Sequence, residues 1–108
     1  MKGRDSSDNE PRYIISVAAK LVGVQTHTLR YYERIGIIEP SRSKGNIRLY
    51  SERDVEILRR VKSLMDELGV NLAGVEVILR MSEHMLQLRR EMDQVREELE
   101  NLREGTRG

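Results

Sequence analysis

The sequence predicts a mainly helical fold, in which a winged helix-turn-helix is followed by one long C-terminal helix. Two short stretches with helical spacing of apolar residues are separated by Gly23, and a basic hairpin with a glycine in its turn follows them. Apolar residues then recur every three or four positions from Ile78 to Leu102, as they do along a coiled coil. The order of these elements along the chain predicts the fold class.

Four segments are expected along the 108 residues. Residues 1–11 are polar and form a flexible tail, and residues 12–80 form the winged helix-turn-helix with its supporting helices. Residues 81–104 form a dimerisation helix, and residues 105–108 form a second flexible tail. A chain this short buries a limited fraction of its surface when it folds alone, so we expect support from a partner subunit.

The first helix of the helix-turn-helix is predicted from its two ends. Residues 13–15 are a candidate short strand, and Ser16 is the expected N-cap of the helix that follows. Gly23 can take the left-handed conformation that ends a helix. The apolar face of this helix is expected to consist of Val17, Ala18, Leu21 and Val22.

The second helix is expected to begin at Gln25 or Thr26 and to end near Ile35, just before a glycine. Gln25 is a poor N-cap compared with serine or aspartate, so Thr26 is the alternative cap. Leu29 and Ile35 should face the core. For Tyr32, packing in the core and contact at the surface are both open.

The segment 37–50 has the pattern of a hairpin, because two apolar runs flank the turn signal Ser43-Lys-Gly-Asn46. A helix over 52–68 follows it. Ser51 and the acidic residues after it suit the start of that helix, and Gly69 ends it.

Two more helices are expected after that glycine. Asn71 should cap a short helix over Leu72–Leu79, and a longer helix should run from about Met81 to Leu102. The longer helix would measure ~33 Å against ~25 Å for the 52–68 helix, so its far end has no intrachain partner of matching length. An intersubunit coiled coil is therefore favoured over a lone helix that folds back. The seam residues expected to dimerise are Ile78, Met81, Met85, Leu88, Met92, Val95, Leu99 and Leu102.

The charges beside the seam bear on how two such helices would pair. If Met85 is position a, the e positions are basic and the g positions acidic, namely Arg89, Arg96 and Arg103, and Glu91 and Glu98. A parallel pair sets these opposite charges against each other, whereas an antiparallel pair sets like charges together. The charge pattern alone therefore favours a parallel pair.

Composition excludes several classes of function. Cysteine is absent, which excludes disulfides, thiolate metal sites and iron–sulfur clusters. His27 and His84 stand 57 positions apart on different predicted elements, and no cluster of nucleophile, base and orienting residue occurs. We therefore expect no metal, no cofactor, no catalytic residue and no enzymatic activity. The chain has no eighteen-residue apolar run and no signal-peptide pattern, so a cytoplasmic protein without membrane contact is expected.

A basic surface on the predicted helix-turn-helix points to nucleic acid. Residues 12–50 hold seven basic and two acidic residues, whereas residues 51–108 hold ten basic and thirteen acidic ones. In the major groove, residues near the start of an inserted helix touch base edges and later ones hold phosphates. The expected base contacts are Thr26, His27 and Thr28, the expected phosphate contacts on the helix are Arg30, Tyr31 and Arg34, and the hairpin adds Arg42, Ser43, Lys44 and Asn46.

The segment 24–38 resembles the recognition helix of MerR-family transcription regulators, through its run Thr28-Leu-Arg-Tyr-Tyr32 ahead of Gly36. Arg48 and Tyr50 match the arginine and tyrosine of that family's wing and complete the expected DNA-binding set. The resemblance implies that Arg30 and Tyr31 contact the DNA backbone. It also implies a homodimer built on an antiparallel helix pair, and we keep that arrangement because exposed ion pairs contribute only about 0.2–1 kcal/mol each.

Within that family, the stretch 67–81 is similar to the heat-shock repressor branch HspR, as are 13–18 and 49–54. This resemblance implies a dimeric repressor of heat-shock and chaperone genes on an inverted-repeat operator of double-stranded DNA, with the Hsp70 chaperone DnaK as a possible co-repressor. Two alternatives remain open. A nitrogen regulator such as GlnR shares the run 71–74, and a coiled-coil adaptor would bind DNA without reading its sequence.

Overall fold

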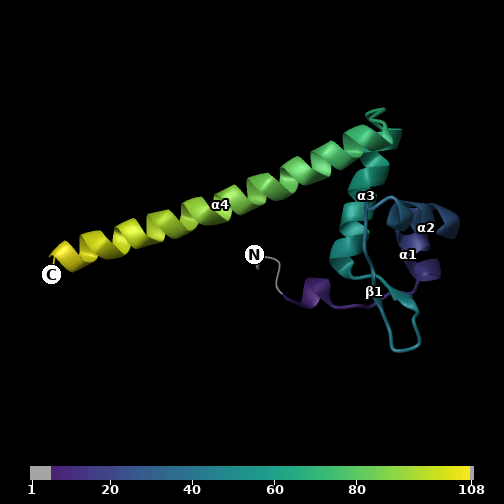
Figure 1. Cartoon of the computed structure of the whole chain (residues 1–108), viewed down its shortest axis with the longest axis horizontal. Helices are drawn as coiled ribbons and strands as arrows, with labels where there is room; N and C mark the ends of the chain where they lie inside the picture. Colours follow the sequence, from purple (N-terminus) through teal and green to yellow (C-terminus); the bar gives the residue numbers. More distant parts are fainter. Residues whose placement is uncertain (1–5, 108) are drawn as a thin grey trace. The chain divides into compact units, whose positions relative to one another are not determined.

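The computed structural model describes residues 6–107 and divides into two units, residues 1–71 and residues 72–108 (Figure 1). The first unit contains η1 (Ser6–Asn9), α1 (Ile15–Val22), α2 (Thr26–Arg34), β1 (Ser41–Arg42), β2 (Arg48–Leu49) and α3 (Glu52–Asp66). The second unit is the helix α4 (Leu72–Arg107). The expected class, a mainly helical winged helix-turn-helix with a long C-terminal helix, is confirmed.

The N-terminal segment is more ordered than expected. Residues 6–9 form a short 3₁₀ helix that lies against α3, where a flexible tail was predicted, and residues 1–5 fall outside the described residues. The candidate strand 13–15 reduces to one bridging residue, because α1 already begins at Ile15. At that bridge the Tyr13 N–H donates to the Tyr50 carbonyl at 2.8 Å, and the Tyr50 N–H donates to the Tyr13 carbonyl at 2.7 Å.

Helix α1 begins earlier than the predicted cap. Its N-cap is Ile14, which has no side-chain cap, and Ser16 lies inside the first turn. The Ile14 carbonyl accepts from the backbone N–H groups of residues 17 and 18 at 3.1 and 3.0 Å. At the other end Gly23 has a φ of 90° and donates its N–H to the Ala19 carbonyl at 2.8 Å, so the predicted glycine cap is confirmed.

The buried face of α1 also differs from the predicted one. Ala18, Ala19 and Val22 are buried, whereas Val17 and Leu21 are 41% and 39% exposed. The reason is that α1 packs on both α2 and α3, and the two small alanines allow these helices to approach closely. The periodicity of the sequence predicted an apolar face on this helix, but the face that packs against α2 and α3 contains smaller residues than predicted.

Helix α2 follows Gln25, which adopts an extended N-cap conformation without a side-chain hydrogen bond. Leu29 is completely buried and Ile35 is half-buried. Tyr32 is only 8% exposed, and its hydroxyl donates to the Met65 sulfur on α3 at 3.6 Å. The open question for Tyr32 is therefore answered by packing.

The hairpin forms as predicted and projects as a narrow loop (Figure 1). Strands β1 and β2 are antiparallel, and Arg42 faces Arg48 across them. The turn is closed by the Asn46 N–H, which donates to the Ser43 carbonyl at 2.8 Å. Asn46 has a φ of 64°, a conformation that asparagine tolerates better than most residues.

Helix α3 begins at the predicted capping region, which forms a capping box. The Ser51 hydroxyl accepts from the Asp54 N–H at 3.0 Å, and the Asp54 carboxylate accepts from the Ser51 N–H at 2.9 Å. Its inner face supplies Val55, Leu58 and Val61, all completely buried. With Leu29 these residues form the centre of the core of the first unit.

Helix α4 is one unbroken helix of 36 residues, about 54 Å long at 1.5 Å per residue. The predicted separate helix over 72–79 is therefore wrong, because Leu79-Arg80-Met81 contains no glycine or proline to end it. The predicted flexible tail 105–108 is helical as far as Arg107, and the Thr106 hydroxyl donates to the Leu102 carbonyl. No helix in the described range 6–107 is long and apolar enough to cross a membrane.

Candidate nucleic-acid interface

Helix α2 presents one exposed face that collects four of the predicted contact residues. His27, Arg30, Tyr31 and Arg34 are spaced by three, one and three positions, which places them on the same side of the helix. All four are exposed, and the Arg34 guanidinium carbon lies 5.5 Å from the centre of the Tyr31 ring. This face therefore offers two arginines, an imidazole and a phenol to a partner.

The two threonines at the start of α2 flank this face. Thr26 and Thr28 are half-buried, so each keeps part of its surface available. Leu29, which lies between the two threonines and the arginine and tyrosine of the exposed face in the sequence, is completely buried in the core. The N-terminal turn of α2 thus has the alternation expected of a helix that is anchored on one side and open on the other.

The hairpin is tied to the same helix by an ion-pair cluster that the sequence analysis missed. The Glu33 carboxylate accepts from Arg48 Nε at 2.5 Å and from Arg42 Nη2 at 2.9 Å. Arg42 and Arg48 face each other across the two strands, so one carboxylate near the end of α2 holds both strands. A usable signal was present, because Glu33 is one of only two acidic residues in the basic segment 12–50.

These contacts change the titration of the carboxylate. The hydrogen bond from Arg48 lowers the pKa of Glu33 below its ordinary value, and the bond from Arg42 adds to this, while burial opposes both. A carboxyl whose pKa falls on folding contributes stability at pH values above its unfolded pKa. That contribution is lost as the pH falls through the lowered folded value, so the cluster is fully formed near neutral pH.

The hairpin turn holds the other predicted contacts. Lys44 and Asn46 are exposed, and Ser43 is half-buried because its hydroxyl accepts from the Ile47 N–H at 3.2 Å. Arg42 is exposed and Arg48 is half-buried. Five of the six predicted hairpin residues therefore keep at least part of their surface open.

Tyr50 is the exception, because the structure places this predicted DNA contact in the core and not on the surface. The residue is completely buried, and burial raises the pKa of its phenol. The physical reason is that its backbone pairs with Tyr13, which directs the ring into the domain. Its hydroxyl has no hydrogen-bond partner among the described residues.

Replacing Tyr50 with phenylalanine should leave DNA affinity unchanged. An unpaired buried hydroxyl is costly, by about 1–3 kcal/mol, so its removal should keep or raise the free energy of unfolding. Urea denaturation and a DNA titration of the Tyr50→Phe variant measure the two effects. A clear loss of DNA affinity in a stably folded variant would return Tyr50 to the interface.

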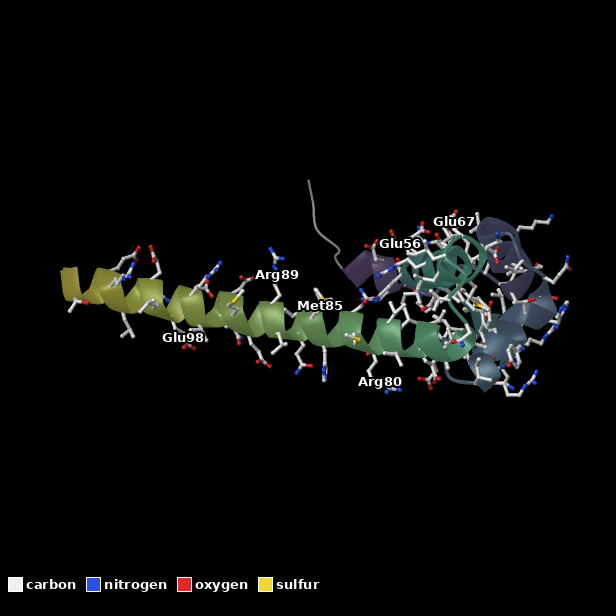
Figure 2. The ribbon with its side chains drawn as sticks, turned by 90° about the horizontal axis from the view of Figure 1, so that it is seen from above. Glu56, Glu67, Arg80, Met85, Arg89 and Glu98 are labelled. Atoms are coloured by element: carbon white, nitrogen blue, oxygen red, sulfur yellow. The ribbon has the colours of Figure 1, made fainter. Side chains whose placement is uncertain are left out.

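The predicted seam on α4 is an exposed apolar stripe. Ile78 is half-buried, and the other seven seam residues are between 49% and 70% exposed. Figure 2 shows Arg89 and Glu98 leaving the helix on opposite sides, as expected for basic and acidic rows that flank a seam. An apolar stripe of this length is typical of surfaces that pack against a partner.

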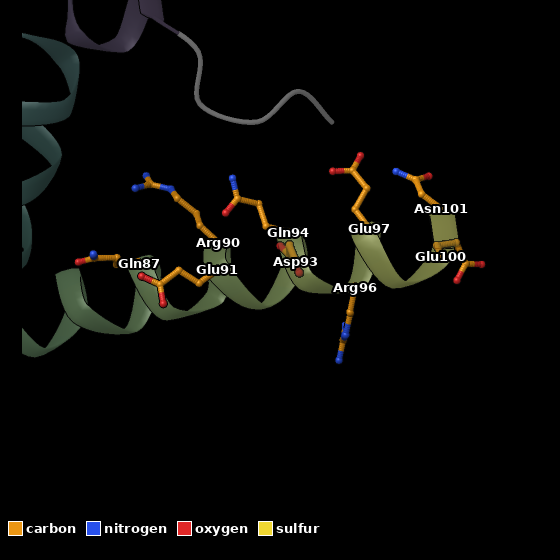
Figure 3. A pocket seen from close by; sticks show the side chains of 9 residues that line it. All are labelled: Gln87, Arg90, Glu91, Asp93, Gln94, Arg96, Glu97, Glu100 and Asn101. Carbon is orange, nitrogen blue, oxygen red and sulfur yellow. The ribbon is translucent and has the colours of Figure 1, made fainter. Parts of the chain in front are cut away.

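The pocket along α4 is open to solvent (Figure 3). The nine side chains in Figure 3 all come from this single helix and border an open surface. In the part of the chain that the structure describes, no group of three histidine, aspartate or glutamate residues could hold a metal ion.

Comparison with known proteins places this geometry in a family. Residues 13–82 match the model of the MerR helix-turn-helix family of regulatory proteins. The chain belongs to the MerR family. This membership confirms the resemblance found in the sequence, and it agrees with the expectation that the chain is a regulator and not an enzyme.

Among curated MerR-type relatives, a Streptomyces coelicolor protein that carries the name heat shock protein HspR is 42% identical over 81 residues, covering 75% of this chain and 54% of that protein. The regulator GlnR of Bacillus anthracis is 33% identical over 84 residues, covering 78% of this chain and 64% of that protein. The chain thus spans between about half and two thirds of the length of these relatives.

Solved MerR-family structures share the fold. A transcriptional regulator from Bacillus cereus superposes with a TM-score of 0.55 at 27% identity, covering 77% of this chain and 73% of that chain. HiNmlR, a MerR-family regulator lacking the sensor domain and solved bound to promoter DNA, superposes with a TM-score of 0.60 at 19% identity, covering 84% and 75%. The second likeness concerns the fold alone.

Proposed function

We propose that this MerR-family protein is a dimeric transcriptional repressor that binds an inverted-repeat DNA operator through α2 and the hairpin. The observation that carries the proposal is the exposed face of α2 with His27, Arg30, Tyr31 and Arg34. Thr26, His27 and Thr28 would touch base edges in the major groove, since they lie at the start of the helix. Arg30, Tyr31 and Arg34 would hold phosphates, and the hairpin would add a second backbone contact.

The dimer in this proposal is formed by the seam of α4. Two such stripes would bury their apolar residues against each other. The resulting dimer would carry two symmetric DNA-binding units, which would bind two symmetric half-sites. We keep the antiparallel orientation of the two helices, although the rows that contain Arg89 and Glu98 favour a parallel one.

The higher identity to HspR than to GlnR favours the heat-shock branch. In that branch the regulated genes would encode chaperones, and DnaK would act as co-repressor. A chaperone occupied by unfolded protein would no longer support the repressor, so repression would fall by mass action. A GlnR-like nitrogen repressor is the second candidate, because that relative matches over 78% of the chain.

Selection from a library of random duplexes tests the proposal. Enrichment of an inverted repeat, with much tighter binding than to a scrambled duplex in fluorescence anisotropy, is the expected result. DnaK from the same host should tighten binding to the selected duplex only, whereas glutamine synthetase should do so for a GlnR-like repressor. No enriched sequence would support the adaptor without specific DNA reading.

Replacing Arg30 with alanine should weaken binding to every duplex about equally and reduce the salt slope of log K by about one unit. The matched control is Arg90→Ala, which removes an exposed arginine from the polar side of α4 (Figure 3). Anisotropy titrations at several salt concentrations measure both slopes. An unchanged slope for Arg30→Ala would remove this residue from the phosphate contacts.

A further inference from the structure

We propose that Glu33 is a positioning residue that sets DNA specificity by holding both wing arginines against α2. This inference rests on the proposed function and adds to it a residue that would itself touch no base. A carboxylate in a DNA-binding face repels phosphate, so its presence there calls for a physical reason. The ion-pair cluster with Arg42 and Arg48 supplies one.

The geometry leaves the arginines usable while it fixes them. A guanidinium has five N–H donors. Arg48 uses only its Nε–H to donate to Glu33, so both of its terminal nitrogens keep their donors for a phosphate. Arg42 is more constrained than Arg48, because two of its nitrogens donate hydrogen bonds within the protein. Its Nη2 donates to Glu33 at 2.9 Å and its Nη1 donates to the Asn46 carbonyl at 3.3 Å, which links α2 through one side chain to the hairpin turn.

This linkage couples the two parts of the proposed interface. The strands β1 and β2 contain only two residues each, so the hairpin has few backbone hydrogen bonds of its own to set its direction. The Glu33 carboxylate, which accepts from both arginines, sets the position of the hairpin relative to α2. A duplex that fits α2 then also contacts the arginines of the wing. A duplex that does not fit is still repelled by the negative charge of Glu33.

Removing the charge should therefore act in opposite directions on the two kinds of DNA. Glu33→Gln lowers the repulsion of any duplex and also frees the hairpin from its alignment. Binding to a scrambled duplex should hold or rise, and binding to the selected duplex should fall. We expect the ratio of the two affinities to drop about five- to tenfold, in line with the loss of charge-assisted hydrogen bonds.

Glu39→Gln is the matched control, because it is the same change at the other acidic residue of the basic segment. Glu39 is exposed, and the arginines of the wing pair with Glu33 and not with it. By net charge alone, this variant should raise the affinity for both duplexes by the same factor and leave their ratio unchanged.

The test measures anisotropy of the full chain and both variants on the selected and scrambled duplexes, with the NMR signal of the Arg48 Nε–H as a readout independent of DNA. In the wild type and Glu39→Gln this proton should exchange slowly with water, and in Glu33→Gln quickly. A drop in the affinity ratio confined to Glu33→Gln supports the inference. If the affinity ratio of Glu33→Gln is unchanged, or if the Arg48 Nε–H exchanges slowly in all three proteins, the inference about Glu33 is wrong and the proposed function still stands. If the wild type prefers no duplex over another, the proposed function is wrong as well.

Discussion

Aspartate at both Leu88 and Val95 should convert the protein to a monomer and abolish its tight binding to an inverted-repeat duplex. Both residues lie in the exposed seam of α4, 64% and 62% exposed in the single chain. A symmetric pair of seams would place four carboxylates in an apolar interface, where each unpaired charge costs several kcal/mol. The dimer should weaken by at least about a thousandfold.

The control for this experiment carries the same two charges on the polar side of the same helix. Gln87→Asp with Gln94→Asp also places two carboxylates seven positions apart, and both glutamines lie on the open polar surface of Figure 3. Sedimentation equilibrium and anisotropy on the selected duplex should show a dimer with normal binding for the control. A dimeric Leu88→Asp, Val95→Asp variant would show that the seam assignment is wrong.

Replacing Leu29 with alanine should unfold much of the DNA-binding unit under mild denaturation. Leu29 is completely buried, and it lies on the recognition helix between the residues proposed to touch DNA. Removing a buried leucine side chain costs about 2–5 kcal/mol, a large fraction of the about 5–15 kcal/mol that stabilises a typical domain. DNA binding should be lost in parallel, because the exposed face of α2 depends on this anchor.

Tyrosine fluorescence offers a selective measurement of this unfolding. All four tyrosines lie between Tyr13 and Tyr50, so their signal reports on the first unit and not on α4. The urea midpoint of Leu29→Ala should fall with an unchanged slope. Leu29→Met keeps nearly the same volume and should cost less than about 1.5 kcal/mol. Equal midpoints for the two variants would contradict the packing role of Leu29.

The features that the sequence determined by itself are those governed by local rules. Gly23 ends α1, Ser51 and Asp54 cap α3, and residues 43–46 form the turn of the hairpin. Each depends on residues within a few positions of one another, and backbone conformation and capping chemistry have few solutions. The exposed apolar seam of α4 follows in the same way from its spacing.

The tertiary structure decided what depends on neighbours far along the chain. It buried Tyr50, a predicted DNA contact, because that residue pairs with Tyr13, and it chose the alanines of α1 over Val17 and Leu21 for the core. It also joined Glu33 to the two wing arginines across 9 and 15 positions. Periodicity identifies an apolar or charged side chain, but only the packing of several elements determines which one it meets.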